Sequence, residues 1–159
     1  MVHWFHLIAL SLWIGSILFF LFVFAPAVHA LPAASAVSLL NRGRHALQAL
    51  AWPAIVVLLL TGIANVAYTA RAAAFSFESA YSMVLALKLL LFLAMVFHQS
   101  MQTLKYGPRI ESLTADTPES CAQWPEPLLA QWRRWFTLLK INGTIGPLIV
   151  LLALGLKRV

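Results

Sequence analysis

Long apolar runs separated by short polar stretches dominate this chain of 159 residues. Four of the runs are long enough to form membrane-spanning helices, which need about 20 apolar residues each. They cover about residues 4–25, 45–70, 80–104 and 135–156. The pattern predicts an all-α fold, with residues 1–159 forming a single integral membrane domain built as a four-transmembrane-helix, up-down bundle.

Two features refine the predicted elements. Residues 1–41 contain no Asp, Glu, Lys or Arg, and the first run is too long for the apolar region of a typical signal peptide. We therefore expect a retained first helix that ends at Pro26. The stretch at about 126–134 mixes apolar and basic residues, which predicts an amphipathic segment lying along the membrane interface before the last helix.

Composition excludes several classes of protein. Apolar residues make up 62% of the chain and charged residues 10%, whereas soluble domains average about 45–50% and about 25%. A soluble globular domain and a disordered chain are thereby excluded. The formal net charge is +6, but the basic residues lie between apolar runs, so we expect a lipid bilayer and no nucleic acid as partner. Cys121 is the sole cysteine, which excludes an internal disulfide and a cysteine-cluster metal site.

The basic residues predict an orientation. The side that holds the first and third loops carries seven of them: Arg42, Arg44, Lys105, Arg109, Arg133, Arg134 and Lys140. The other side carries three: Arg71, Lys157 and Arg158. Because cytoplasmic loops carry the excess of Lys and Arg, the first side is expected to be cytoplasmic and both termini periplasmic.

Lys88 is the clearest candidate for function, since a charged side chain inside a membrane is expensive. It lies about seven residues into the third predicted helix, or roughly 10 Å along the axis. Two interpretations remain open. The side chain extends to the outer headgroups, or it is a fixed cation that binds a haem propionate, a quinone oxygen or a proton. The second interpretation makes Lys88 the candidate catalytic residue.

The histidines form two groups. His3 and His6 lie at the outer end of the first helix, and the seven-residue spacing of His6 and Trp13 places both on one face, toward the bundle interior. His45 and His98 lie at the inner end, too far from His6 to share a metal atom. Neutral imidazole held between helices is a common haem or metal ligand. The candidate haem ligands are His6, His45 and His98; the candidate metal ligands are these three and His3. Asn142 is placed to cap an inner-end site or to pair with a neighbouring helix.

Short motifs give the chain a resemblance to two families of small bacterial inner-membrane proteins. The motifs are His6 with Trp13-Ile14-Gly15, Arg44 before the second span, Thr61-Gly62 within it, Tyr81 with Leu85-Ala86-Leu87-Lys88, and Arg133-Arg134 before the last span. This pattern resembles the copper-resistance D (CopD) family. It is also similar to the HemJ-type protoporphyrinogen oxidases, which have His then Trp in the first helix and Lys followed by a late His in the third. Their Asn-Glu-x-Pro motif is not matched, because Gly143 follows Asn142.

The resemblance implies haem b and redox chemistry in one branch and copper passage in the other, and three hypotheses follow. The first is a haem-b redox protein acting on a quinone or a porphyrin-type molecule, with His6 or the pair His45 and His98 on iron and Lys88 or Arg44 on the propionates; if it is an enzyme, it is an oxidoreductase. The second is copper uptake by Met1, His3 and His6, with His98 and Met95 or Met101 passing the ion on. The third is a non-catalytic subunit of a larger membrane complex or homo-oligomer.

Overall fold

The computed structural model of the chain describes residues 2–72, 79–118 and 123–155. These residues are helical except for short connections, and no strand occurs among them. Met1, Cys121, Lys157 and Arg158 lie outside the described residues, so what the sequence predicts for them stays a prediction.

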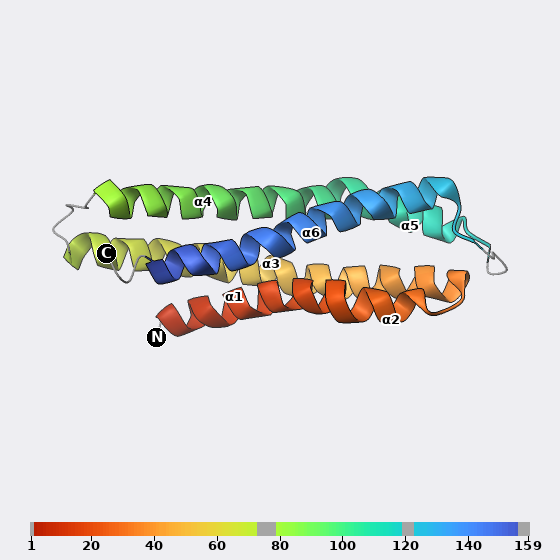
Figure 1. Cartoon of the computed structure of the whole chain (residues 1–159), viewed down its shortest axis with the longest axis horizontal. Helices are drawn as coiled ribbons and strands as arrows, with labels where there is room; N and C mark the ends of the chain where they lie inside the picture. Colours follow the sequence, from red (N-terminus) through yellow and green to blue (C-terminus); the bar gives the residue numbers. More distant parts are fainter. Residues whose placement is uncertain (1, 73–78, 119–122, 156–159) are drawn as a thin grey trace.

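The helices line up as long rods that run alternately up and down (Figure 1). The first rod contains α1 (Val2–Phe19), the π-helical segment η1 (Phe20–Phe24) and α2 (Ala25–His29), and the second is α3 (Ala33–Ala72). The third contains α4 (Ser79–Ser100), the π-helical segment η2 (Met101–Tyr106) and α5 (Gly107–Ala115), and the fourth is α6 (Glu126–Gly155). The start of α1 and the end of α6 lie at one end of the bundle, here called the outer end; α2 and α5 lie at the inner end (Figure 1).

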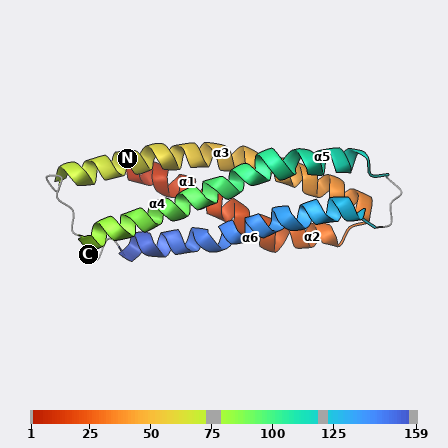
Figure 2. The same ribbon diagram turned by 90° about the horizontal axis from the view of Figure 1, so that it is seen from above.

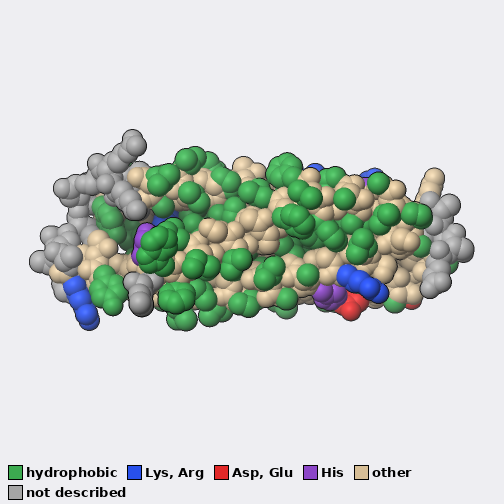
Figure 3. Space-filling view, turned by 90° about the horizontal axis from the view of Figure 1, so that it is seen from below, with side chains coloured by type: hydrophobic (Ala, Val, Ile, Leu, Met, Phe, Trp, Pro, Cys, Tyr) green, Lys and Arg blue, Asp and Glu red, His purple; other side chains and the backbone are tan. Residues whose placement is uncertain are grey.

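Within the described residues, four helical stretches are long and apolar enough to cross a membrane: Val2–His29, Ala33–Arg71, Tyr81–Ala115 and Glu126–Leu154. The prediction of an all-helical chain with four candidate spans is confirmed. On the face drawn in Figure 3, apolar side chains cover the middle of the bundle, and ionisable side chains lie toward its ends.

The rods pack as two pairs. α1 lies against α3, α4 lies against α6, and α1 also meets α6 (Figures 1 and 2). Trp13 on α1 is 1% exposed and contacts the Phe92 ring of α4 edge to face, with centroids 6.1 Å apart. Further along the same face, Phe20 contacts the Trp135 ring of α6 at 5.4 Å. Large aromatic side chains thus hold the two pairs of rods together.

The second rod is longer than predicted. It begins at Ala33 instead of about residue 45, so only Ala30–Pro32 separate it from α2. At 1.5 Å per residue α3 measures about 60 Å, twice the roughly 30 Å hydrocarbon thickness of a bilayer. The polar residues Asn41, Arg42 and Arg44 therefore lie within a helix that is longer than a membrane span requires.

Pro26 does not end the first rod, contrary to the prediction. The helix passes through η1 into α2, where the Ala25 N–H donates to the Phe20 carbonyl, five residues back. Pro108 follows η2 in the same way, and there the Gly107 N–H donates to the Gln102 carbonyl. A proline lacks an N–H and crowds the carbonyl four residues earlier, and a wider π-turn accommodates both effects without breaking the rod.

The stretch at 126–134 is the first part of α6, continuous with the last rod. Its Leu128 and Trp132 are buried in the bundle, at 0% and 1% exposure, while Arg133 and Arg134 are exposed. The amphipathic pattern is therefore present, but its apolar side packs on the protein. The third rod also continues past residue 104, to Ala115.

Candidate functional site

The candidate site at the outer end is built on His6. Its side chain crosses from α1 to α3, where Nδ1 lies 2.8 Å from the Thr61 hydroxyl oxygen. That hydroxyl has one proton, and it donates to the Val57 carbonyl at 2.6 Å. Thr61 Oγ1 therefore accepts from His6, and the His6 Nδ1 carries the hydrogen. In the neutral ring, Nε2 is then left with an unshared electron pair.

Lys88 provides the charge at this site. It lies on α4, half-buried, and is close enough to the His6 ring to interact with it electrostatically. No carboxylate of the described residues forms an ion pair with the Lys88 ammonium. The outer end thus combines a ring nitrogen with an unshared pair, on α1, and a cation without a counterion among the described residues, on α4.

Trp13 lies on the same face of α1 as His6, one heptad deeper. Its indole Nε1 is buried and has no hydrogen-bond partner among the described residues. An unpaired buried donor costs about 1–3 kcal/mol, so this N–H is available to a polar group held between the rods. The predicted placement of His6 and Trp13 on the interior face is confirmed, with Trp13 buried and His6 half-buried.

His98 forms the second histidine position, on α4. Its Nδ1 lies 2.9 Å from Asn142 Oδ1 on α6. The Asn142 amide nitrogen donates to the Met95 carbonyl at 3.2 Å, which fixes which end of the amide faces His98. An amide oxygen only accepts, so His98 also carries its hydrogen on Nδ1 and leaves Nε2 unshared. The prediction that Asn142 pairs with a neighbouring helix is confirmed.

The two histidine positions are separate. His98 is ten residues beyond Lys88 on α4, or about 15 Å along the helix. His6 bonds to α3 and His98 bonds to α6. These contacts agree with the prediction that His6 and His98 do not share one metal atom. Among the described residues, no three His, Cys, Asp or Glu side chains come together as a metal site.

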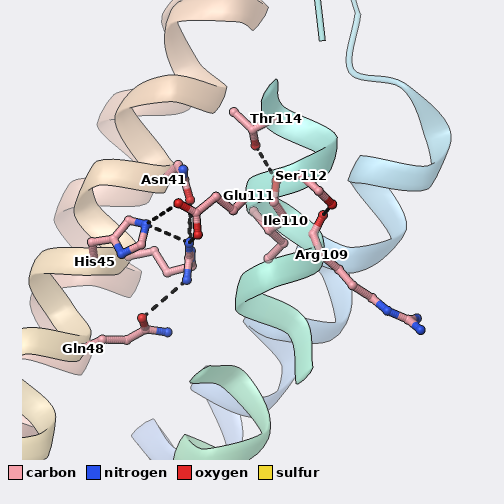
Figure 4. A network of polar contacts seen from close by, with 9 residues as sticks. Asn41, His45, Gln48, Arg109, Ile110, Glu111, Ser112 and Thr114 are labelled. Atoms are coloured by element: carbon pink, nitrogen blue, oxygen red, sulfur yellow. Dashed lines mark hydrogen bonds and ion pairs between the residues drawn. The ribbon is translucent and has the colours of Figure 1, made fainter. Parts of the chain in front are cut away.

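Asn41, His45 and Gln48 of α3 and Glu111 of α5 form a third polar group at the inner end (Figure 4), and Arg44 is bonded to them. It is 1% exposed, and its Nε and Nη2 both donate to Asn41 Oδ1, at 3.0 and 2.8 Å. Nη1 donates to Gln48 Oε1 at 3.4 Å, and Glu111 from α5 lies 3.8 Å from Nη2. The guanidinium is thus held by the protein's own side chains, which leaves it less suited to haem propionates than the sequence suggested.

His45 belongs to this third group and not to the His98 position. Its Nε2 lies 3.0 Å from Arg44 Nη2 and 3.9 Å from Glu111. Because an arginine only donates, the His45 Nε2 accepts, and this ring nitrogen is already occupied. The sequence-based pairing of His45 with His98 on one iron is not supported by these contacts, since His45 is bonded to Arg44 and His98 to Asn142.

Two further histidines and a tyrosine have exposed side chains. His3 is exposed at the start of α1, and His29 is exposed beside the rings of Trp124 and Phe136. Tyr68 is 63% exposed.

Sequence reasoning missed two residues that matter. The apolar pattern ends the third run near residue 104, so it gives no sign that Glu111 lies on a helix beside Arg44. From the sequence, Thr61 is named only as part of the Thr61-Gly62 motif, although a hydroxyl inside an apolar run is the signal of an interhelical bond.

No family model, no curated protein and no solved structure matches the chain.

Proposed function

We propose that the protein is an inner-membrane redox protein that binds haem b, with the His6 Nε2 as an iron ligand and Lys88 beside the haem propionates. The observation that carries this proposal is the hydrogen bond from His6 to Thr61. It places the hydrogen of the neutral ring on Nδ1, leaves the electron pair of Nε2 unshared, and fixes the orientation of the ring. Metal-ligating histidines characteristically donate their other N–H to such an acceptor.

The donor set at the outer end fits this group. An imidazole nitrogen with an unshared pair is a standard axial haem ligand. A propionate in a membrane needs a cation, and no carboxylate of the described residues neutralises Lys88. The unpaired Trp13 N–H adds a donor on the same face. The His98 Nε2 offers the same chemistry for a second ligand position.

When bound, haem b supplies one-electron transfer. The chain's own residues then have distinct tasks. Thr61 orients the His6 ring. Lys88 pairs with a negatively charged group between the rods, such as a propionate, or carries a proton at its Nζ. The apolar outer surface of the rods would admit a substrate dissolved in the bilayer, for which we propose a quinone or a porphyrinogen. On this proposal the protein is an oxidoreductase with Lys88 as the residue nearest the substrate.

The test is an absorption spectrum of the full chain, produced with ample haem and purified in detergent. We expect a Soret band that shifts when dithionite reduces the protein. His6→Ala should remove the haem bound at the outer end. His29→Ala is the matched control, because it replaces an exposed histidine at the inner end. A colourless wild-type preparation, or equal haem content in all three proteins, would overturn the proposal.

Copper passage is the second candidate, and the same unshared Nε2 atoms support it. His3 lies close enough to His6 to interact with it electrostatically, which gives two imidazoles at the outer end of α1. Against it stands the cationic Lys88 beside His6, which would repel Cu(I). Metal analysis of the purified protein separates the candidates, because the copper proposal requires copper without haem and its loss in His6→Ala, His98→Ala.

We further propose, on the sequence motifs alone, that the chain is related to the copper-resistance D and HemJ-type families and lies in a bacterial inner membrane with both termini periplasmic. A reporter active only in the periplasm, fused after Val159, tests the orientation. A reporter inserted between Asp116 and Cys121 is the reciprocal control and should be inactive. The alternative hypothesis, that the protein is a non-catalytic subunit of a larger complex, is tested by measuring the mass of the particle in detergent. A monomer with bound haem would exclude this alternative.

A further inference from the structure

A groove at the inner end of the bundle is lined by none of the residues of the three polar groups described above. It follows one face of the first turns of α3 and has a volume of ≈ 530 Å³. Its lining residues are Leu31, Ala34, Ser35, Ser38, Leu39 and Arg42. The spacing of three or four residues puts these side chains in one stripe along the helix. The stripe combines two hydroxyls, one cation and two leucines.

The polar groups of this stripe have no partner within the protein. No hydrogen bond or ion pair joins Ser35, Ser38 or Arg42 to another described residue, and all three side chains are exposed. Helical hydroxyls elsewhere in the chain turn back onto their own helix: Ser100 donates to the Val96 carbonyl at 2.9 Å, Thr114 to the Ile110 carbonyl at 2.7 Å and Thr137 to the Arg133 carbonyl at 2.8 Å. The groove therefore presents unused hydroxyl and guanidinium donors together.

Arg42 also differs from its neighbour Arg44. The Arg44 guanidinium is buried and bonded to Asn41 and Gln48, whereas Arg42 is exposed and unpaired. It is the first full charge of the chain, because residues 1–41 contain none. The groove thus has one cation and no acidic side chain among its lining residues, so an anion would be its counterpart.

The level of the groove matches a membrane interface. Leu31 and Leu39 are exposed at 43% and 38%, so apolar surface continues to the groove. The Trp124 indole N–H donates to the Ala33 carbonyl at 3.1 Å, next to the lining residue Ala34. Tryptophan prefers the headgroup level of a bilayer. An exposed leucine, a tryptophan and an unpaired arginine at one level fit a lipid with an apolar chain and a charged head.

We propose that this groove binds an anionic phospholipid, with the phosphate on Arg42, Ser35 and Ser38 and the glycerol and upper acyl chain along Leu31 and Leu39. The ligand chemistry is a phosphate ester, which arginine binds as a charge-assisted hydrogen-bonding partner. The adjoining apolar side chains favour the lipid over a soluble phosphate as the source. This site is independent of the haem proposal, since none of its residues touches His6, Lys88 or His98.

The test compares ligands on the full chain in delipidated detergent solution, by native mass spectrometry and by thermal unfolding. We expect phosphatidylglycerol to bind and to raise the unfolding temperature more than phosphatidylcholine. Arg42→Gln should weaken phosphatidylglycerol binding about fivefold, the effect of one cation near an anionic lipid. Ser35→Ala, Ser38→Ala should weaken it further. Arg134→Gln removes an exposed cation outside the groove and is the matched control.

Three outcomes would overturn the proposal. The first is equal binding of both lipids by the wild type. The second is equal losses in Arg42→Gln and Arg134→Gln, which would indicate general charge attraction. The third is binding of glycerol 3-phosphate or inorganic phosphate as tightly as phosphatidylglycerol, which would make the site one for a soluble phosphate. Unfolding profiles without lipid check that each variant is folded.

Discussion

Asn142 on α6 accepts a hydrogen bond from the His98 Nδ1 of α4 at 2.9 Å and is itself 0% exposed. Its amide nitrogen donates to the Met95 carbonyl. One side chain thus joins two rods and sets the tautomer of a histidine. The bond is a product of helix pairing, since the two residues are 44 positions apart.

Asn142→Leu should destabilise the bundle by about 1–3 kcal/mol, because it leaves the partly buried His98 N–H without an acceptor. Unfolding by denaturant in mixed micelles measures the loss. His98→Phe combined with Asn142→Leu removes both partners, and the double variant should lose less than the sum of the two single losses. Additive losses would show that the bond contributes nothing. Nitrogen NMR of His98 should report hydrogen on Nδ1 in the wild type.

Arg44 and Glu111 should respond very differently to substitution, although they form an ion pair at 3.8 Å. The Glu111 side chain is 60% exposed and the Arg44 side chain 2%. Glu111→Gln is expected to change stability by about 0.5 kcal/mol or less, as for other solvent-exposed pairs. Arg44→Met should cost about 1–3 kcal/mol, since Asn41 and Gln48 lose their donor. The same micelle unfolding measures both, and equal effects would contradict the network as described.

The position of the Arg44 side chain leaves no room for a side chain at residue 107. A methyl group built on Gly107 comes within 2.7 Å of Arg44 Nη1 and 3.2 Å of the Gln102 carbonyl oxygen. The guanidinium cannot move aside easily, because Asn41 and Gln48 hold it. Gly107→Ala should therefore destabilise the protein by about 1–3 kcal/mol, the usual cost of overpacking.

Gly15→Ala provides the matched control for Gly107, since nothing lies within 4 Å of the added methyl group. In that helix interior the change should stabilise, by up to about 1 kcal/mol, because alanine favours a helix more than glycine does. Similar effects of the two substitutions would show that Arg44 yields to the methyl group.

The four apolar runs predicted the rods because hydrophobic length is a local property of the sequence. The helical period also predicts which face of α1 points into the bundle, and Trp13 on that face is buried. Helix ends were less predictable. Pro26 and Pro108 are ordinarily helix breakers, and whether a π-turn absorbs them depends on the neighbouring rods, which one segment does not reveal.

The partners of the candidate residues were the least predictable part. The sequence indicates Arg44 as a cation for a cofactor, but the structure pairs it with the protein's own side chains. Asn41 lies within the same helix turn, and Glu111 contacts Arg44 because the third rod extends to Ala115. His6 was singled out correctly as an interior residue, yet its bond to Thr61 depends on the register between α1 and α3. That register is set by packing along the whole length of two rods.

Thr61 should control the ligand strength of His6 in the proposed haem site. Thr61→Val keeps the side-chain shape but removes the oxygen that accepts from His6 Nδ1. We expect haem affinity at the outer site to fall by about 10–100-fold, as for other second-layer partners of metal-binding histidines. Thr61→Ser retains the oxygen and should retain most of the affinity. Haem titration of the stripped protein, followed at the Soret band, measures both. Equal affinities in wild type and Thr61→Val would show that the bond does not orient a ligand, even if haem binds elsewhere in the bundle.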